Sequence, residues 1–350
     1  MKGNEALGEA AIQAGCRYYF GYPITPQSEL LEYMAVNLPK RGGVFVQSES
    51  EIAGIGMLYG ASASGKRAMT SSSSPGISLM QETISYLCSA ELPGVIVNVS
   101  RGGPGLGRIR PAQSDYFQAT KGGGHGDYHL IVLAPASVQE MAKLATLAFD
   151  LSDKYRNPVM ILGDGIVAQM MESVDLDSLK KVEQLPEKPW AVTGPKGRGQ
   201  NLVLSAPFTD PELEVLNQKL TAKYQEIAEQ EVRYEEVMTE DADVILVAFG
   251  IVSRFSKAAI AELREQGIKV GLIRPITLFP FPYDIINKRA DKTKLFLDIE
   301  MNEGQMLEDV KLAINGKAKV EFFGGGGGKL TPPNEIAAKV KELIAGGANT

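Results

Sequence analysis

The sequence predicts an α/β protein in which a parallel sheet carries helices on both faces and a smaller α/β domain follows. Short apolar runs alternate with helical patterns along residues 1–170, and this is the rhythm of parallel strands joined by crossover helices. The rhythm stops after residue 170 and resumes near residue 243, which divides the 350 residues into two domains. The strands expected in the first domain are residues 18–22, 44–46, 67–70, 95–99, 129–133 and 158–162.

The helices of the first domain have readable starts. Thr25 is expected to cap a helix over residues 26–38, with Pro26 at the first helical position, where its missing N–H costs nothing. Ser137 and Glu140 are expected to form a capping box at the start of a later helix.

The helix expected over residues 51–63 has a surface of very small side chains. Each glycine in a helix costs about 1 kcal/mol relative to alanine, so the composition is not explained by helix stability. We expect another surface to pack very close to this helix. The small residues are Ala53, Gly54, Gly56, Gly60, Ala61 and Ala63.

Residues 171–241 are expected to form a connector that contains a polar helical arm over residues 211–237, because prolines interrupt the stretch and charges dominate the helix. Residues 242–350 form the second domain. Its one low-complexity tract, residues 324–328, is expected to be a hinge or loop, since no Lys-Ser or Lys-Thr follows to make a phosphate cradle. The strands expected in this domain are residues 244–249, 269–273, 294–299 and 319–323.

Composition excludes several classes of function. The net charge is −6 and the pI about 5.3, so no overall field attracts nucleic acid or an anionic membrane. Cys16 and Cys88 stand alone without a CxxC pair, and His125 and His129 are the only histidines, which argues against an iron–sulfur cluster, a zinc site or a histidine triad. No apolar run approaches the ~20 residues that span a bilayer, and we expect a cytoplasmic protein.

A glycine-rich loop with three arginines directly follows the strand expected at 95–99. Loops at the carboxyl ends of parallel strands are where ligands bind. Arg101, Arg108 and Arg110 suit a carboxylate or a phosphate, because arginine grips either group with two parallel hydrogen bonds. The alternative is a solvated loop with a basic rim, in which Arg108 and Arg110 lie farther out than Arg101.

Four consecutive serines, Ser71 to Ser74, also follow a strand and precede a helix. Their hydroxyls could bind an anion at the helix N-terminus, or they could simply cap the helix. Nucleophilic catalysis is poorly supported, because the serines have no evident base and no GxSxG motif occurs.

Residues 163–165 read Gly-Asp-Gly, which is how the thiamine diphosphate signature of many enzymes begins. That signature needs paired asparagines roughly 25–30 residues later, and no Asn-Asn pair occurs in this sequence. We therefore interpret Asp164 as part of the turn after a buried strand. The arginine loop also lacks the GxxxxGK[ST] pattern and a following dinucleotide acid, so NAD binding is poorly supported.

Five motifs occur together at the ends of the expected strands. In this combination the sequence resembles the α subunit of a 2-oxoacid:ferredoxin oxidoreductase, with the closest resemblance to the branched-chain (2-oxoisovalerate) type. The second domain resembles the transketolase-C-like domain of the same family through residues 274–280 and 300–305. The five motifs are YPITP at 22–26, QSESE at 47–51, SSSSPG at 71–76, RGGP at 101–104 and KGGGHGD at 121–127.

The resemblance implies a thiamine-diphosphate pyrimidine-domain fold and half of a cofactor site. The pyrimidine ring would lie in this chain and the diphosphate with its Mg²⁺ in a β subunit, which accounts for the missing asparagines; this chain itself holds no metal. Glu51 would hydrogen-bond the pyrimidine N1′ and so help the cofactor lose its thiazolium C2 proton, with Glu49 as the rival carboxylate. The further cofactor-binding residues that the resemblance implies are Tyr22, Pro23, Ile24, Ser73 and Ser74.

The implied substrate contacts are the Thr25 hydroxyl and Arg101, which would bind the substrate carboxylate, with Arg108 as a further candidate. The implied reaction is oxidative decarboxylation of a 2-oxoacid to an acyl-coenzyme A and CO₂, with reduction of ferredoxin. 2-Oxoglutarate is the alternative substrate, because Arg108 or Arg110 could hold its second carboxylate. An alternative of another class is a non-catalytic α/β subunit that binds a partner or an anion.

The resemblance also implies an assembly. Iron–sulfur clusters would reside on partners, since Cys16 and Cys88 cannot hold one. The expected partners are the β subunit, a ferredoxin-like subunit with or without a γ subunit, and ferredoxin, in a hetero-oligomer with dimerised α subunits.

Overall fold

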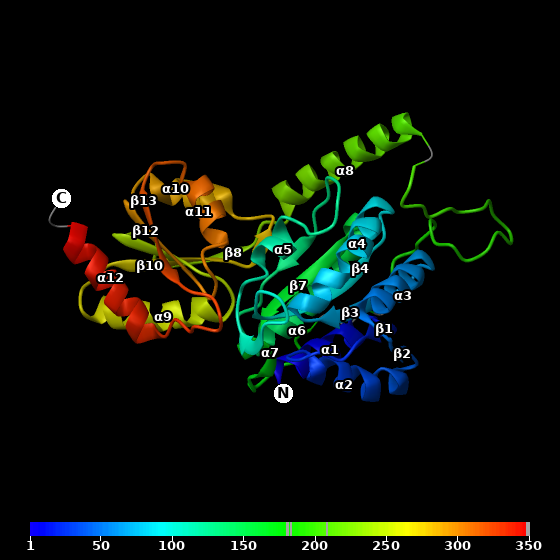
Figure 1. The fold of residues 1–350 in the computed structure, drawn as a ribbon, viewed down its shortest axis with the longest axis horizontal. Helices are drawn as coiled ribbons and strands as arrows, with labels where there is room; N and C mark the ends of the chain where they lie inside the picture. Colours follow the sequence, from blue (N-terminus) through cyan, green and yellow to red (C-terminus); the bar gives the residue numbers. More distant parts are fainter. Residues whose placement is uncertain (180–181, 183, 208, 348–350) are drawn as a thin grey trace.

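The computed structural model describes residues 1–179, 182, 184–207 and 209–347, which form two α/β units (Figure 1). The first unit contains a sheet in the order β11-β6-β7-β4-β3-β1-β2, with β5 paired to β4; its edge strand β11 (Thr277–Phe279) comes from the later part of the chain. Its central strands are parallel, as predicted. The strands that the chain contributes in this unit are β1 (Tyr18–Gly21), β2 (Val44–Gln47), β3 (Ala68–Ser72), β4 (Gly94–Gly102), β5 (Arg108–Pro111), β6 (Ile131–Leu133) and β7 (Pro158–Asp164).

Helices cover both faces of this sheet (Figure 1). On one side α1 packs against α2 and α6, and on the other α3 packs against α4. The helices of this unit are α1 (Gly3–Gln13), α2 (Ser28–Asn37), η1 (Pro39–Arg41), α3 (Glu51–Ala63), α4 (Ser74–Ser89), α5 (Tyr116–Thr120), α6 (Val138–Tyr155) and α7 (Gly165–Gln169).

The start of α2 differs from the prediction. The helix begins at Ser28, its N-cap is Gln27, and a cis peptide bond joins Thr25 to Pro26, so neither residue takes the predicted capping role. Residues 24–27 instead form a turn in which the Gln27 amide donates to the Ile24 carbonyl at 3.1 Å. The prediction was wrong because the turn is fixed by buried side chains from distant segments, which local residue preferences do not reveal.

Two other helix starts were predicted more closely. Helix α3 has the predicted bounds and is capped by Ser50, whose Oγ accepts from the Ala53 amide. At α6, Ser137 accepts from the Glu140 amide as predicted, but the Glu140 carboxylate accepts from the Ala136 amide instead of completing the capping box. That carboxylate also binds Arg274 of the second unit, which fixes its orientation.

The connector contains α8 (Asp210–Gln230), capped by Thr209 and lying along the first unit (Figure 1). The predicted arm extended to residue 237, and this was wrong in its last part. Residues Tyr234–Val237 form β8, which pairs antiparallel with β10 at the edge of the second sheet. Only one side of α8 is buried, through Leu220, Tyr224 and Ile227.

The second unit has a five-stranded sheet in the order β13-β12-β9-β10-β8. Its strands are β8, β9 (Val244–Val247), β10 (Val270–Pro275), β12 (Leu295–Glu300) and β13 (Lys319–Gly324), and its helices are α9 (Gly250–Glu265), α10 (Tyr283–Ala290), α11 (Met306–Ile314) and α12 (Pro333–Gly347). Strand β11 (Thr277–Phe279) leaves this unit and pairs antiparallel with β6 of the first sheet. Within the described residues, no helix combines the length and apolar character needed to cross a bilayer.

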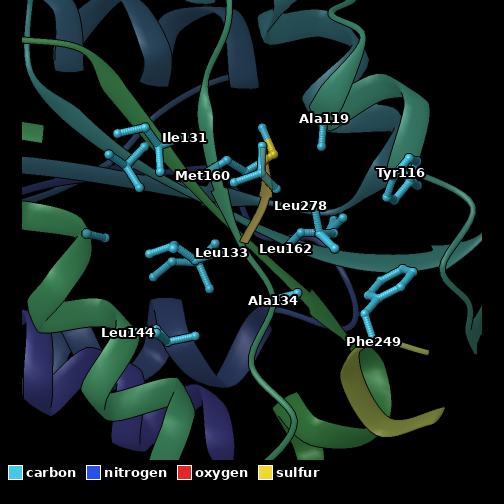
Figure 2. Close-up of a cluster of buried hydrophobic side chains, with 14 of the residues drawn as sticks. Tyr116, Ala119, Ile131, Leu133, Ala134, Leu144, Met160, Leu162, Phe249 and Leu278 are labelled. Carbon is cyan, nitrogen blue, oxygen red and sulfur yellow. The ribbon is translucent and has the colours of Figure 1, made fainter. Parts of the chain in front are cut away.

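A continuous apolar core joins the two units. Phe249 and Leu278 of the second unit lie among buried side chains of the first, including Tyr116 and Leu133 (Figure 2). The rings of Tyr116 and Phe249 are 5.9 Å apart. Burial of such side chains is the main favourable term in folding, so the two units stabilise one another.

A buried carboxyl in the second sheet gives a prediction about stability. Asp298 on β12 is fully buried and lies next to the buried carboxyl group of Glu300. Burial, and then the neighbouring Glu300, raise the pKa of Asp298 well above its usual range. Because the folded state holds this proton more tightly than the unfolded state, stability falls as the pH rises from the unfolded pKa towards the folded one.

We expect Asp298→Asn to raise the melting temperature near neutral pH by at least about 2 °C. The gain should vanish near pH 3, below the unfolded pKa of about 3.9, and it can be measured by thermal unfolding across a pH series. Asp291→Asn is the control, because Lys317 lowers the pKa of this exposed carboxyl and the change should not stabilise the chain. An unchanged melting temperature for Asp298→Asn at pH 7 would contradict the prediction.

Candidate functional site

The candidate site lies at the carboxyl edge of the first sheet. Strands β1, β2, β3 and β4 run parallel and end at neighbouring positions, so the loops that follow them meet at one edge. This edge brings together the turn at residues 22–26, the start of α3, the start of α4 and the loop after β4. It is the usual ligand-binding edge of such sheets.

Glu51 occupies the first position of α3 and is only 6 % exposed. Among the described residues, none hydrogen-bonds or ion-pairs with its carboxylate. The first turn of α4 lies against it, since a methyl group at Gly76 would come within 2.5 Å of Glu51 Oε1. Glu51 therefore lies at the N-terminal end of α3, the end at which a helix dipole favours negative charge. Glu49, the rival carboxylate, is exposed.

Several hydroxyl groups around this edge are buried and lack a hydrogen-bond partner in the chain. Most buried polar atoms in folded proteins are paired, so a group of unpaired ones at a strand edge indicates a place for a polar ligand. One of them, Ser72 Oγ, would lie 2.0 Å from a methyl group at Gly76 and so shares the surroundings of Glu51. The unpaired hydroxyls near these strand ends belong to Ser48, Thr70, Ser72 and Ser73.

Arg101 and Thr25 lie next to each other, as the loop with three arginines and the YPITP motif suggested. Arg101 is 6 % exposed; its Nη1 donates to the Thr25 carbonyl at 3.0 Å and its Nη2 donates to the Leu106 carbonyl at 2.8 Å. Its Nε is buried and has no partner. A guanidinium has five N–H donors, so Arg101 can still bind an anion while it holds both loops.

A second buried network supports the backbone of Arg101. The Arg101 amide donates to Ser74 Oγ at 2.9 Å, and that hydroxyl donates to Asp115 Oδ2 at 2.6 Å. Asn98 Nδ2 donates to the same carboxylate oxygen at 2.9 Å, and burial raises the pKa of Asp115. The Ser74 hydroxyl is therefore engaged within the chain. Asp115 and Asn98 were not found from the sequence, where they stand as isolated polar residues.

The remaining predicted residues lie at the mouth of the site. Tyr22, Pro23 and Thr25 are exposed and Ile24 is half-buried, so their side chains face outward from the turn. Arg108 is exposed on β5. Its part in substrate binding, like the roles of the others, stays a prediction.

The glycine tract at residues 324–328 packs against the arginine loop. A methyl group at Gly102 would lie 3.7 Å from the backbone of Gly327 and Gly328, and the Gly326 amide donates to Glu303 Oε1 at 2.7 Å. Beside this contact is a hollow of about 410 Å³, to which both units contribute, including Ser74, Pro104, Asn302 and Gly326. The second unit thus packs against the loop that carries Arg101.

Other groups with possible chemistry have structural partners. Asp164 is the last residue of buried strand β7 and caps α7, and not part of the predicted turn; it accepts from the Ile166 and Val167 amides and from the Ile251 amide of the second unit. Burial raises the pKa of Cys16 and of Cys88 to about 12, so neither is a thiolate at neutral pH. In the part of the chain that the structure describes, no group of three or more His, Cys, Asp or Glu side chains could hold a metal ion.

The fold is that of a thiamine diphosphate-binding unit followed by a transketolase-C-like unit. The fold resembles a split-gene transketolase, with a TM-score of 0.62 and 16 % identity over 99 % of this chain and 98 % of that one. Residues 9–241 match the family described as pyruvate flavodoxin/ferredoxin oxidoreductase, thiamine diphosphate-binding. Residues 242–336 match core domain II of pyruvate:ferredoxin oxidoreductase.

The chain belongs to the 2-oxoacid:ferredoxin oxidoreductase family. It is 52 % identical to the ketoisovalerate oxidoreductase subunit VorB of Methanothermobacter marburgensis, covering 100 % of this chain and 98 % of that one. It is 41 % identical to the 2-oxoglutarate synthase subunit KorA of Archaeoglobus fulgidus, covering 93 % and 94 %. It also resembles the 2-oxoglutarate:ferredoxin oxidoreductase of Magnetococcus marinus, with a TM-score of 0.86 and 28 % identity over 98 % of this chain; it spans 65 % of that chain.

Proposed function

We propose that this chain is the α subunit of a branched-chain 2-oxoacid:ferredoxin oxidoreductase and holds the pyrimidine half of thiamine diphosphate. The observation that carries the proposal is the buried, unpartnered Glu51 carboxylate with unpaired hydroxyls at the same sheet edge. A ring with both hydrogen-bond donors and acceptors would satisfy these groups, whereas leaving them unpaired costs about 1–3 kcal/mol each. The identity to the ketoisovalerate relative supports the substrate class.

In this proposal each residue has a separate task. When bound, the cofactor supplies the carbon that attacks the 2-oxo group and takes up the electrons released by decarboxylation. Glu51 holds positive charge at the pyrimidine nitrogen, because a carboxylate favours the protonated form of a neighbouring base. Arg101 binds the substrate carboxylate with its free N–H groups, and Thr25 contacts the substrate from the adjoining turn.

The exposed surface beside the site supports a partner subunit. Ile52, Gly56, Met57 and Gly60 of α3 are all exposed, and a methyl group at Gly56 or Gly60 would meet no atom of the chain within 4 Å. This is the face of small residues for which the sequence predicted close packing. We assign it to the β subunit, which would supply the ligands of the diphosphate and Mg²⁺.

Electron transfer and acyl transfer belong to the rest of the assembly. Cys16 and Cys88 are buried in separate parts of the core, so iron–sulfur clusters reside on partner subunits in this proposal. Coenzyme A is the acyl acceptor and ferredoxin the electron acceptor. We place the assembly in the cytoplasm.

Turnover of three 2-oxoacids by the complex co-purified with its native partners tests the proposal. We expect coenzyme A-dependent reduction of a viologen dye, with kcat/KM at least about 10-fold higher for 2-oxoisovalerate than for 2-oxoglutarate or pyruvate, since a fitted apolar pocket discriminates by about 1–3 kcal/mol. The isolated chain should be inactive. A higher kcat/KM for 2-oxoglutarate would contradict the substrate and favour Arg108 or Arg110 as a second carboxylate site. A complex with no 2-oxoacid-dependent activity would contradict the enzyme itself.

A further inference from the structure

We propose that Gln27 is a positioning residue that fixes the turn at residues 22–26, which carries Thr25 into the site. The inference rests on the proposed function, because it assigns Gln27 an effect on 2-oxoacid binding. Gln27 is fully buried and is the N-cap of α2, yet its side chain makes no capping hydrogen bond. It bonds instead to the turn and to β3.

The side chain of Gln27 lies at the end of a directed chain of hydrogen bonds. The hydroxyl of Tyr19 lies 2.5 Å from Ser71 Oγ, and Ser71 Oγ donates to Gln27 Oε1 at 2.7 Å. Gln27 Nε2 then donates to the Tyr22 carbonyl at 3.0 Å. Because the Ser71 hydroxyl donates its hydrogen to Gln27, Tyr19 must be the donor in the hydrogen bond between Tyr19 and Ser71. Burial raises the pKa of Tyr19, which keeps that proton in place.

The pairing of β1 with β3 leaves space for this chain of hydrogen bonds. Gly21 of β1 is paired with Ser71 of β3, and Tyr19 projects from the same face of β1 two residues earlier. The Tyr19 ring crosses the space where a side chain at position 21 would stand, because a methyl group at Gly21 would lie 2.8 Å from its hydroxyl. Stacking on Phe45, with ring centroids 5.7 Å apart, holds the ring there.

Two more buried side chains hold neighbouring carbonyls of the same turn. Arg101 Nη1 donates to the Thr25 carbonyl, and Asn4 Nδ2 donates to the Pro26 carbonyl, each at 3.0 Å. With Gln27 on the Tyr22 carbonyl, the backbone of the turn is fixed at three points while its side chains point outward. Gln27 therefore fixes the first residue of the turn, Tyr22, whereas Arg101 and Asn4 bond only to its last two residues.

Such a turn presents Thr25 in one position before any ligand arrives. A misplacement of about 1 Å can cost about 10²-fold in rate, even when the altered residue does not touch the reacting atoms. Methionine at position 27 would keep the volume but remove both hydrogen bonds. It would free the Tyr22 carbonyl and let the turn shift.

The test measures steady-state kinetics of the reconstituted complex containing Gln27→Met. We expect the KM for 2-oxoisovalerate to rise and kcat/KM to fall by about 10–10²-fold. Ser71→Ala removes the hydrogen bonds of Ser71 to Tyr19 and Gln27 but keeps the bond from Gln27 to the Tyr22 carbonyl, so it should give a smaller effect in the same direction. Gln139→Met is the matched control, because Gln139 also bonds backbone groups, at Asp175, but lies on α6 away from the site; its KM should equal that of the wild type.

The readout separates positioning from folding, because loss of folded protein lowers the amount of active complex and leaves KM unchanged. A lowered melting temperature with an unchanged KM in both Gln27→Met and Ser71→Ala would overturn the assignment of Gln27. The Glu51→Gln complex is measured in parallel. Full activity of that complex would overturn the proposed function itself, so the two failures are distinguishable.

Discussion

Replacing Glu51 by glutamine should lower kcat of the reconstituted complex by about 10²–10⁴-fold, the range that a positioned acid–base group contributes. Glutamine keeps the shape of the side chain but cannot hold positive charge at the pyrimidine nitrogen. Folding should be preserved or improved, because a buried charge without a partner in the chain is removed. Coenzyme A-dependent viologen reduction measures the rate, and thermal unfolding of the chain measures the folding.

Glu49→Gln is the matched control for this change. It makes the same substitution two residues earlier, at an exposed side chain, and should leave kcat within about 2-fold of the wild type, since surface substitutions usually change little. If Glu51→Gln kept full activity, the chain would have to act as the non-catalytic partner-binding or anion-binding subunit. If Glu49→Gln alone abolished activity, the rival carboxylate would be the functional one.

Much of the fold follows from local patterns in the sequence. Each central parallel strand is a short apolar run, and these runs predict β1, β3, β4 and β7 to within a few residues. The antiparallel edge strands β5, β8 and β11 were missed. They are three or four residues long and partly polar, and each is a strand only because another strand offers it hydrogen bonds. The partner of β5 is the preceding strand β4, whereas β8 and β11 pair with the distant strands β10 and β6. The helix predicted through residue 237 ends at Gln230 for the same reason.

The candidate site, like the fold, was predicted from the sequence only in part. Motifs that follow strands placed Glu51, Thr25 and Arg101 at one sheet edge, because parallel strands bring their carboxyl ends together. The side chains that hold those motifs were not predicted. Gln27 looks like an ordinary residue in the first turn of a helix, and its partner Ser71 lies 44 residues away. Only the tertiary fold, which brings the residue before α2 to β3, makes them a pair.

The Arg101→Lys change should raise the KM for 2-oxoisovalerate by about 10²-fold, equivalent to roughly 2.7 kcal/mol. Arg101 holds the Thr25 and Leu106 carbonyls with separate nitrogens and has a buried Nε left over for an anion. Lysine keeps the positive charge but concentrates it at one nitrogen, which cannot reach both carbonyls and a carboxylate together. Each lost hydrogen bond to a charged group costs about 1.5–3 kcal/mol.

Arg17→Lys separates this effect from a general loss of arginine geometry. Arg17 Nη1 also donates to two backbone carbonyls, those of Ile12 and Cys16, but it precedes β1 at the opposite edge of the sheet. The control should lower the melting temperature without changing the KM. An unchanged KM in Arg101→Lys would show that the guanidinium only ties the two loops together and that another group binds the substrate carboxylate. A KM that is raised in Arg101→Lys and unchanged in Arg17→Lys would show that the guanidinium of Arg101 binds the substrate carboxylate. That carboxylate would then lie beside Thr25, because the same guanidinium already donates to the Thr25 carbonyl.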